Sequence, residues 1–176
     1  MIYFFTFIFV LLLVIIVLLS IQFFNIVFRG FAPFISTKFR VILTIIKELD
    51  LIGDEVVYEL GAGQAGFLRA VEEKFKNDKL VGVEYSWWPY FLARLQLSLS
   101  NSRIKIIRKD FFKINLREAD IIYCFLNPKT MNKLGSKIKK ECRPGTLLIS
   151  YCFKVKDLEL EKTIKEGDNN IYFYRV

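Results

Sequence analysis

The sequence of 176 residues contains no histidine, and this absence excludes several kinds of chemistry. Without histidine there is no Ser-His-Asp triad, no Cys-His nucleophile pair and no histidine-ligated metal site. The three cysteines, Cys124, Cys142 and Cys152, are odd in number and show no C-x-x-C spacing. We therefore expect no bound metal and no disulfide framework, and we interpret the cysteines as reduced thiols.

Charge is missing from the first part of the chain, because residues 1–28 contain no Asp, Glu, Lys or Arg. As a helix this segment is about 42 Å long, which exceeds the roughly 30 Å hydrocarbon core of a bilayer. It lacks the basic start and the small-residue cleavage site of a signal peptide. We expect a retained transmembrane helix over residues 1–28, a juxtamembrane linker over 29–35 and one domain over 36–176.

The sequence also lacks a second uncharged run of about 18 residues, which excludes a transporter with several membrane spans. Arg29, Lys38 and Arg40 follow the apolar segment, and the chain has 26 Lys and Arg against 18 Asp and Glu. Positive charge beside a span favours the cytoplasmic side. These features predict a single-pass membrane protein with its domain in the cytoplasm and with contacts to anionic lipid.

Residues 36–176 alternate short apolar runs with amphipathic segments. We expect strands at 55–60, 79–84, 104–107, 119–126, 146–153 and 171–176. We expect helices at 36–49, after Gly66, at 87–99 and at 129–141, the first capped by Ser36 or Thr37. In the helix at 87–99, Phe91, Leu92, Leu95 and Leu99 are expected to face inward.

This alternation predicts an α/β, Rossmann-like fold: a mostly parallel sheet with helices on both faces. The last two strands have no amphipathic helix between them, which indicates an antiparallel edge strand. Between the first strand and its helix, Gly61-Ala62-Gly63-Gln64-Ala65-Gly66 fits the pattern G-x-G-x-x-G. Such a loop is compatible with a dinucleotide, with S-adenosylmethionine or with a tight turn that binds nothing.

Three acidic residues stand at three successive strand ends, where open α/β sheets bind their ligands. Glu84 suits ribose hydroxyls in either cofactor. Glu59 lies two residues before the first glycine, where a carboxylate disfavours a pyrophosphate and favours the sulfonium and ammonium of S-adenosylmethionine. Asp110, followed by Phe111, suits an adenine amine and ring. The acids therefore favour S-adenosylmethionine over a dinucleotide.

The stretches VVYELGAGQAGF, VGVEYSWWPYFLAR, RKDFFKINLREADIIYCFLNPKTM and ECRPGTLLISYCF carry a family resemblance. From about residue 33 to residue 153 the chain resembles class I S-adenosylmethionine-dependent methyltransferases. Within them it looks most like the small membrane-anchored protein-lysine methyltransferases of the ATP synthase c subunit and the adenine nucleotide translocase, with their prokaryotic relatives. The sequence departs from the family loop at Ala65 and Gly66, which stand in shifted order, and at Phe67, which replaces a basic residue.

The resemblance implies S-adenosyl-L-methionine as cofactor. Together with the residues above, it implies cofactor contacts at Glu59, Gly61, Ala62, Gly63, Glu84, Tyr85, Asp110 and Phe111. It places the methyl acceptor at the loop after the fourth strand, where we expect Asn127 and Pro128 to orient an amine.

The resemblance implies a membrane-associated protein as substrate, and we do not expect nucleic acid as a partner. In two alternatives the chain is still an enzyme. One methylates a lipid or quinone-like small molecule, and the other is a nicotinamide-dependent oxidoreductase that binds its cofactor at the same glycine loop. A third alternative is an anchored scaffold that binds no cofactor.

Overall fold

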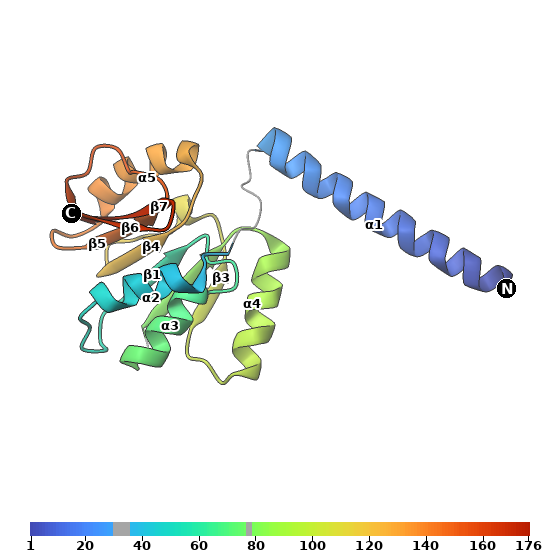
Figure 1. Ribbon diagram of the computed structural model, residues 1–176, viewed down its shortest axis with the longest axis horizontal. Helices are drawn as coiled ribbons and strands as arrows, with labels where there is room; N and C mark the ends of the chain where they lie inside the picture. The colour runs from blue at the N-terminus through green and yellow to red at the C-terminus, as the bar shows by residue number, and fades with distance from the viewer. Residues whose placement is uncertain (30–35, 77–78) are drawn as a thin grey trace. The chain divides into compact units, whose positions relative to one another are not determined.

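The computed structural model describes residues 1–29, 36–76 and 79–176, and the chain divides into two compact units, Met1–Ile35 and Ser36–Val176. The described part of the first unit is one helix, α1 (Ile2–Arg29) (Figure 1). Its stretch Ile2–Ile21 is long and apolar enough to cross a membrane, judged by length and composition, and none of it is buried. Apart from Arg29, the expected linker at 29–35 lies outside the described residues.

The second unit is built on a seven-stranded sheet of order β3-β2-β1-β4-β5-β7-β6 (Figure 1). Its strands are β1 (Val57–Leu60), β2 (Leu80–Glu84), β3 (Lys105–Arg108), β4 (Ile121–Cys124), β5 (Leu147–Tyr151), β6 (Leu160–Glu166) and β7 (Asn169–Arg175). The first five strands are parallel, whereas β7 runs antiparallel to both β5 and β6. The predicted α/β fold with an antiparallel edge is confirmed.

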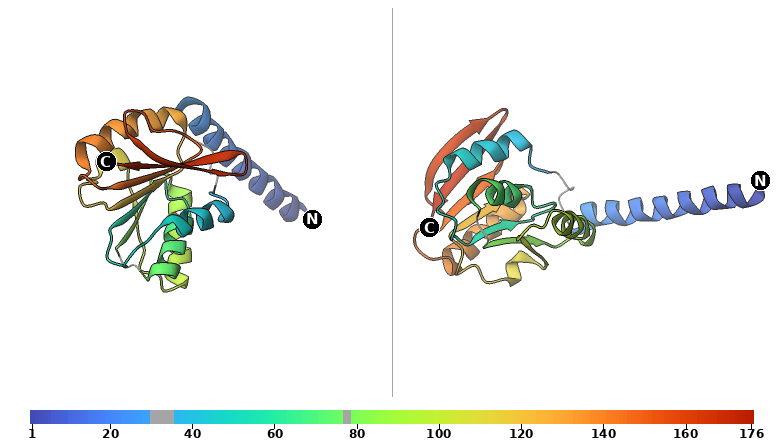
Figure 2. Two further views of the ribbon diagram at one scale, coloured as in Figure 1. Left: turned by 60° about the vertical axis from the view of Figure 1, so that its left-hand side comes forward. Right: turned by 90° about the horizontal axis from the view of Figure 1, so that it is seen from below.

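Helices cover both faces of this sheet, as predicted (Figure 2, left). On one face lie α2 (Phe39–Glu48), α3 (Gly66–Phe75) and α4 (Trp87–Leu99). On the other lie the short 3₁₀ helix η1 (Phe111–Lys113) and α5 (Pro128–Glu141). A buried cluster fills each side, one around Ile45, Phe67 and Tyr123 and the other around Met131 and Leu134. The central strands are buried on both faces, which explains their unbroken apolar runs.

Strand β6 was not predicted from the sequence. Its residues, LEKTIKE, are mostly charged or polar and mostly exposed. An outer strand of this kind carries no apolar run, and it forms because its backbone pairs with β7 across a turn that contains Gly167. Long-range backbone pairing, rather than side-chain burial, therefore decides this element.

The predicted inward face of α4 was wrong. Of the four residues expected inside, Phe91, Leu95 and Leu99 are exposed and Leu92 is half-buried, while Ala93 and Leu97 are buried. Helix α4 is apolar on almost every side, so spacing alone does not identify the side that meets the sheet. In the structure the small Ala93 lets the helix approach the sheet, and α4 packs against β2 and β3 at its end (Figure 1).

Candidate cofactor and acceptor site

The site lies where the strand order reverses. The chain runs from β1 outward to β2 and β3, and then crosses back to β4 on the other side of β1. In such sheets the carboxyl ends of the strands around the reversal form a ligand-binding crevice. Glu59, Glu84, Asp110 and Asn127 stand at or just beyond the carboxyl ends of β1, β2, β3 and β4. The structure thus brings these four of the predicted site residues to one edge.

The glycine loop between β1 and α3 has the backbone shape that its residues allow. Gly61 has a φ of +72° and Gly63 a φ of +53°, values at which a side chain is strained. A Cβ atom on Gly61 would lie 2.8 Å from Cδ2 of Leu126. The N–H groups of Gly61 and Ala62 donate to the carbonyl oxygen of Val83 at 2.8 and 3.0 Å. The loop is therefore fixed to β2, with no side chain at the glycine positions.

The shifted glycine order does not break this loop. Ala65 adopts the left-handed conformation itself, with a φ of +55°, and its N–H donates to the carbonyl oxygen of Ala62 at 2.6 Å. Gly66 then begins α3. Phe67, in place of a basic residue, is buried, with its ring 4.5 Å from that of Tyr123. The departures therefore preserve the turn from β1 into α3.

Glu84 is held in place at the end of β2. One oxygen of its buried carboxylate accepts from the N–H of Gly63 at 3.0 Å, and the other accepts from the N–H of Ser86 at 2.7 Å. An ionised carboxylate accepts about four hydrogen bonds, so both oxygens keep capacity for ribose hydroxyls. The next residue, Tyr85, is half-exposed.

Glu59 lies beneath the same loop. Its Oε2 atom accepts from the N–H of Leu68, in the first turn of α3, at 3.2 Å. The pKa of Glu59 is raised to about 8. Burial is the main cause and the nearby charge of Glu84 adds to it, while the N–H groups of Leu68 and Phe67 oppose the rise. Glu59 therefore places a titratable charge directly under the glycine loop.

Asp110 and Phe111 form the turn after β3. The Oδ1 atom of Asp110 accepts from the N–H of Phe112 at 2.9 Å and so caps η1. The rings of Phe111 and Phe112 lie 4.7 Å apart, and both Asp110 and Phe111 are half-buried. A carboxylate beside a partly open aromatic ring suits an adenine, as the sequence predicts.

Asn127 caps α5, because its Oδ1 accepts from the N–H of Thr130 at 2.9 Å, and Pro128 occupies the first position of the helix. Behind this loop the Phe125 ring meets the Tyr151 ring edge-on at 4.8 Å. The predicted acceptor side therefore consists of a capped helix start beside aromatic rings.

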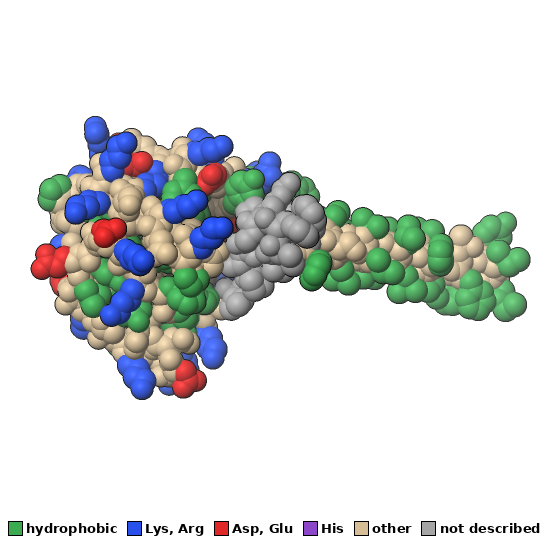
Figure 3. All heavy atoms as spheres, turned by 90° about the horizontal axis from the view of Figure 1, so that it is seen from above, with side chains coloured by type: hydrophobic (Ala, Val, Ile, Leu, Met, Phe, Trp, Pro, Cys, Tyr) green, Lys and Arg blue, Asp and Glu red, His purple; other side chains and the backbone are tan. Residues whose placement is uncertain are grey.

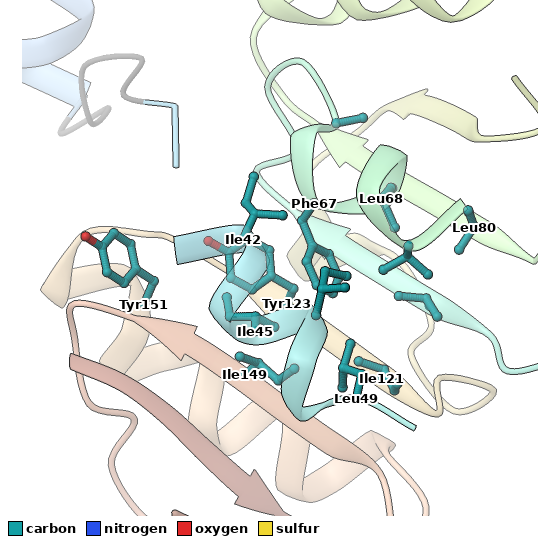
Figure 4. Close-up of a cluster of buried hydrophobic side chains, with 14 of the residues drawn as sticks. Ile42, Ile45, Leu49, Phe67, Leu68, Leu80, Ile121, Tyr123, Ile149 and Tyr151 are labelled. Carbon is teal, nitrogen blue, oxygen red and sulfur yellow. The ribbon is translucent and has the colours of Figure 1, made fainter. Parts of the chain in front are cut away.

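A hydroxyl pair at this edge was missed from the sequence. Tyr123 on β4, labelled in Figure 4, pairs directly with Glu59 on β1. Its hydroxyl lies 2.7 Å from Oγ1 of Thr37. Thr37 therefore does not cap α2, whose N-cap is Lys38, without a side-chain bond. The sequence feature that could have indicated this pair is the tyrosine within the apolar run IIYCF, because the hydroxyl of a buried tyrosine requires a hydrogen-bond partner.

The place of β7 between β5 and β6 distinguishes this sheet from the all-parallel dinucleotide-binding sheet of order 3-2-1-4-5-6. Together with the glycine loop and Glu84, it defines a class I S-adenosylmethionine-dependent methyltransferase. An RNA methyltransferase from Salinibacter ruber, crystallised with S-adenosyl-L-homocysteine, has this fold. It superposes with a TM-score of 0.75 at 19% sequence identity, over 81% of this chain and 94% of that one.

The sequence profile of the ANTKMT methyltransferase domain matches residues 59–162, and the chain belongs to this family. A protein-lysine N-methyltransferase from Saccharolobus islandicus is 27% identical over 81% of this chain and 92% of that protein. The adenine nucleotide translocase lysine N-methyltransferase of Mus musculus is 24% identical over 82% of this chain and 63% of that protein.

Membership of this family confirms that the chain is a methyltransferase whose cofactor is S-adenosyl-L-methionine. The nicotinamide-dependent oxidoreductase and the cofactor-free scaffold were therefore wrong alternatives. The residues present fit the cofactor, because Gly61 and Gly63 leave room for close approach and Glu84 is a fixed acceptor. Among the described residues, no group of His, Cys, Asp and Glu is placed to hold a metal ion.

Proposed function

We propose that this chain is a protein-lysine N-methyltransferase that acts on a membrane-associated protein. The observation that carries the proposal is the match to the Saccharolobus islandicus protein-lysine N-methyltransferase over 92% of that protein's length. The mouse relative, whose stated substrate is the adenine nucleotide translocase, supports a membrane-embedded acceptor. The apolar stretch Ile2–Ile21 of α1, none of which is buried, supports anchoring in a bilayer.

When bound, S-adenosylmethionine would supply the methyl group of its sulfonium to an amine by in-line transfer: the N–C bond would form as the S–C bond breaks, with S-adenosylhomocysteine as the leaving group. The backbone of Gly61, Ala62 and Gly63 would hold it, with Glu84 at the ribose, Asp110 beside Phe111 at the adenine, and Tyr85 alongside. Glu59, whose pKa of about 8 keeps it mostly protonated at neutral pH in the free chain, would carry negative charge when the cationic part of the cofactor lies near it and lowers that pKa. The chain's main contributions are orientation and exclusion of water, since methyl transfer requires no covalent help from the protein.

The acceptor lysine must be neutral before it attacks. Phe125 and Tyr151 form an apolar surface that lowers a lysine pKa by desolvation, and the oxygens of Asn127 orient the amine. Tyr123 does not serve as the base, because burial raises its pKa well above 10. In our proposal the lysine loses its proton to water as it enters the site.

We propose further that α1 spans the membrane once and that residues 36–176 lie on the cytoplasmic side. The charge pattern supports this orientation, since residues 1–28 carry no charged side chain and Arg29, Lys38 and Arg40 follow them.

The test uses the full chain in lipid vesicles with isotopically labelled S-adenosylmethionine and a membrane-protein fraction. We expect label on lysine side chains of membrane proteins, identified by mass spectrometry of peptides, and none with Glu84→Ala. Label in the organic extract would instead show a lipid or quinone-like acceptor. If S-adenosylhomocysteine binds and no lysine is labelled, the proposal is wrong.

A further inference from the structure

The outer surface of α4 is apolar and exposed. Trp87, Trp88, Phe91, Leu95 and Leu99 recur at the spacing that aligns side chains along one side of a helix. Trp87 is 59% exposed, Trp88 62%, Leu95 50% and Leu99 81%. The ring of Phe91 stacks on that of Trp87 at 5.5 Å. We call these five residues the α4 face; they lie opposite the buried Ala93 and Leu97.

The segment that carries this face is also free of negative charge. Residues 85–109 contain no Asp or Glu. They contain five basic residues, Arg94, Arg103, Lys105, Arg108 and Lys109. On the face drawn in Figure 3, which views the molecule from above, Lys and Arg side chains are spread among hydrophobic side chains and a few Asp and Glu side chains.

A groove of about 280 Å³ separates α4 from the outer strand β3, and its lining includes Arg94 and Lys105. Two cations beside an apolar stripe match the two parts of an anionic phospholipid, a phosphate headgroup and an acyl chain. Tryptophan is also enriched at the boundary between membrane and water. On α5, Lys137 does not fit this role, since its side chain is largely buried and donates to Glu141. The other lysines of α5 are exposed, but α5 carries no exposed aromatic stripe beside them.

We propose that the α4 face docks on the surface of an anionic bilayer. The inference rests on the proposed function, in which α1 is a membrane anchor. In the sequence, residues 36–176 follow α1 after only six residues, so an anchor at α1 keeps the domain that carries the α4 face close to the bilayer surface. Because α4 begins three residues after Glu84, docking holds the cofactor end of the sheet at the membrane surface. The enzyme would then select lysines close to the lipid headgroups.

The chain itself provides the probe, because Trp87 and Trp88 are its two tryptophans. The full chain is reconstituted into vesicles with and without anionic lipid, and tryptophan emission is recorded with brominated lipids and with iodide. We expect a blue shift, quenching by brominated lipid and protection from iodide in the anionic vesicles. The proposal is overturned if the protein stays in the vesicles but its tryptophan emission is quenched by iodide and not by brominated lipid.

Charge placed within the α4 face separates docking from anchoring. Leu95→Glu with Leu99→Glu should lower the ratio of docked to undocked protein about tenfold for each leucine removed from lipid. Gln96→Glu adds one negative charge, half that of the double variant, near the same helix end but beside the face, and it should retain lipid quenching. Cofactor binding by each variant checks that it is folded. Equal quenching in the double variant and in Gln96→Glu contradicts the proposal.

Two further readouts distinguish the headgroup contact and the anchor. Arg94→Gln with Lys105→Gln should reduce lipid quenching in anionic vesicles to the level seen in zwitterionic ones. If quenching is equal in both vesicle types for the unmodified chain, the anionic part of the proposal is wrong. Release of the protein by an alkaline wash overturns α1 as a span, whereas tryptophan quenching before the wash still supports docking by α4.

Discussion

Glu59 and Glu84 both accept hydrogen bonds from the backbone of the segment that leads from the glycine loop into α3. The N–H of Gly63 donates to Glu84 at 3.0 Å, and the N–H of Leu68 donates to Glu59 at 3.2 Å. The two acids lie on neighbouring parallel strands, both are buried, and the charge of Glu84 raises the pKa of Glu59. A loop with few side chains is thus given a fixed shape by two carboxylates before any cofactor binds.

Glu84→Ala should weaken binding of S-adenosylhomocysteine at least about tenfold, because the N–H groups of Gly63 and Ser86 lose their acceptor. Isothermal calorimetry measures the affinity, and NAD should not bind to either protein. Glu73→Gln, an exposed acid of α3, is the matched control and should bind normally. Unchanged affinity in Glu84→Ala would contradict the assignment of Glu84.

Gly61→Ala should lose both stability and cofactor affinity. Its φ of +72° strains any side chain, and the added Cβ would lie 2.8 Å from Leu126. Gly167→Ala, in the β6–β7 turn, has a φ of +62° but no atom within 4 Å of its Cβ. Each change should lower the free energy of unfolding by about 1 kcal/mol. A comparable affinity loss in both variants would show that the loop has no special role.

Glu59→Gln should remove a pH dependence of stability. The raised pKa, about 8 against an ordinary 4.5, means that the folded chain keeps a proton that the unfolded chain has lost. The contribution of Glu59 to the free energy of unfolding is fully present below pH 4.5 and is lost as the pH rises through 8. Thermal unfolding followed by circular dichroism should therefore show the wild type weakening relative to Glu59→Gln as the pH rises. Parallel pH profiles would refute this expectation.

Asn127 caps α5, and two substitutions at this position distinguish capping from a role in methyl transfer. Asn127→Ala should lower the free energy of unfolding by about 1 kcal/mol through loss of the α5 cap. Asn127→Ser keeps a capping oxygen and should retain that stability. If Asn127 also orients the acceptor amine, methyl transfer by Asn127→Ser should still fall while cofactor affinity is kept. Full activity in Asn127→Ser would limit the residue to capping.

The Thr37–Tyr123 hydroxyl pair should behave as one unit in a double-mutant cycle. Thr37→Val and Tyr123→Phe each leave a polar partner behind, which costs about 1 kcal/mol of stability, and the double variant should lose little more. Tyr151→Phe is the control, since its bond from Asn169 is long at 3.4 Å. Additive losses at Thr37 and Tyr123 would show that the contact contributes nothing.

The sequence by itself determined the parallel strands, their helices and the edge at which Glu59, Glu84, Asp110 and Asn127 meet. These features follow from local patterns, because apolar runs, glycines and strand-end acids carry their meaning within a few residues. The same patterns anticipated the family and the cofactor.

The tertiary structure alone decided β6, the exposed side of α4 and the bond between Thr37 and Tyr123. It also decided that Glu59 binds the start of α3 beneath the loop. Each of these depends on a partner distant in sequence: β7 for a charged outer strand, the sheet for a helix apolar on nearly every side, and a neighbouring segment for a buried hydroxyl. The local sequence does not distinguish between the possible strand pairings, helix orientations and hydroxyl partners. Contacts between distant segments decide among them, and these contacts exist only in the folded chain.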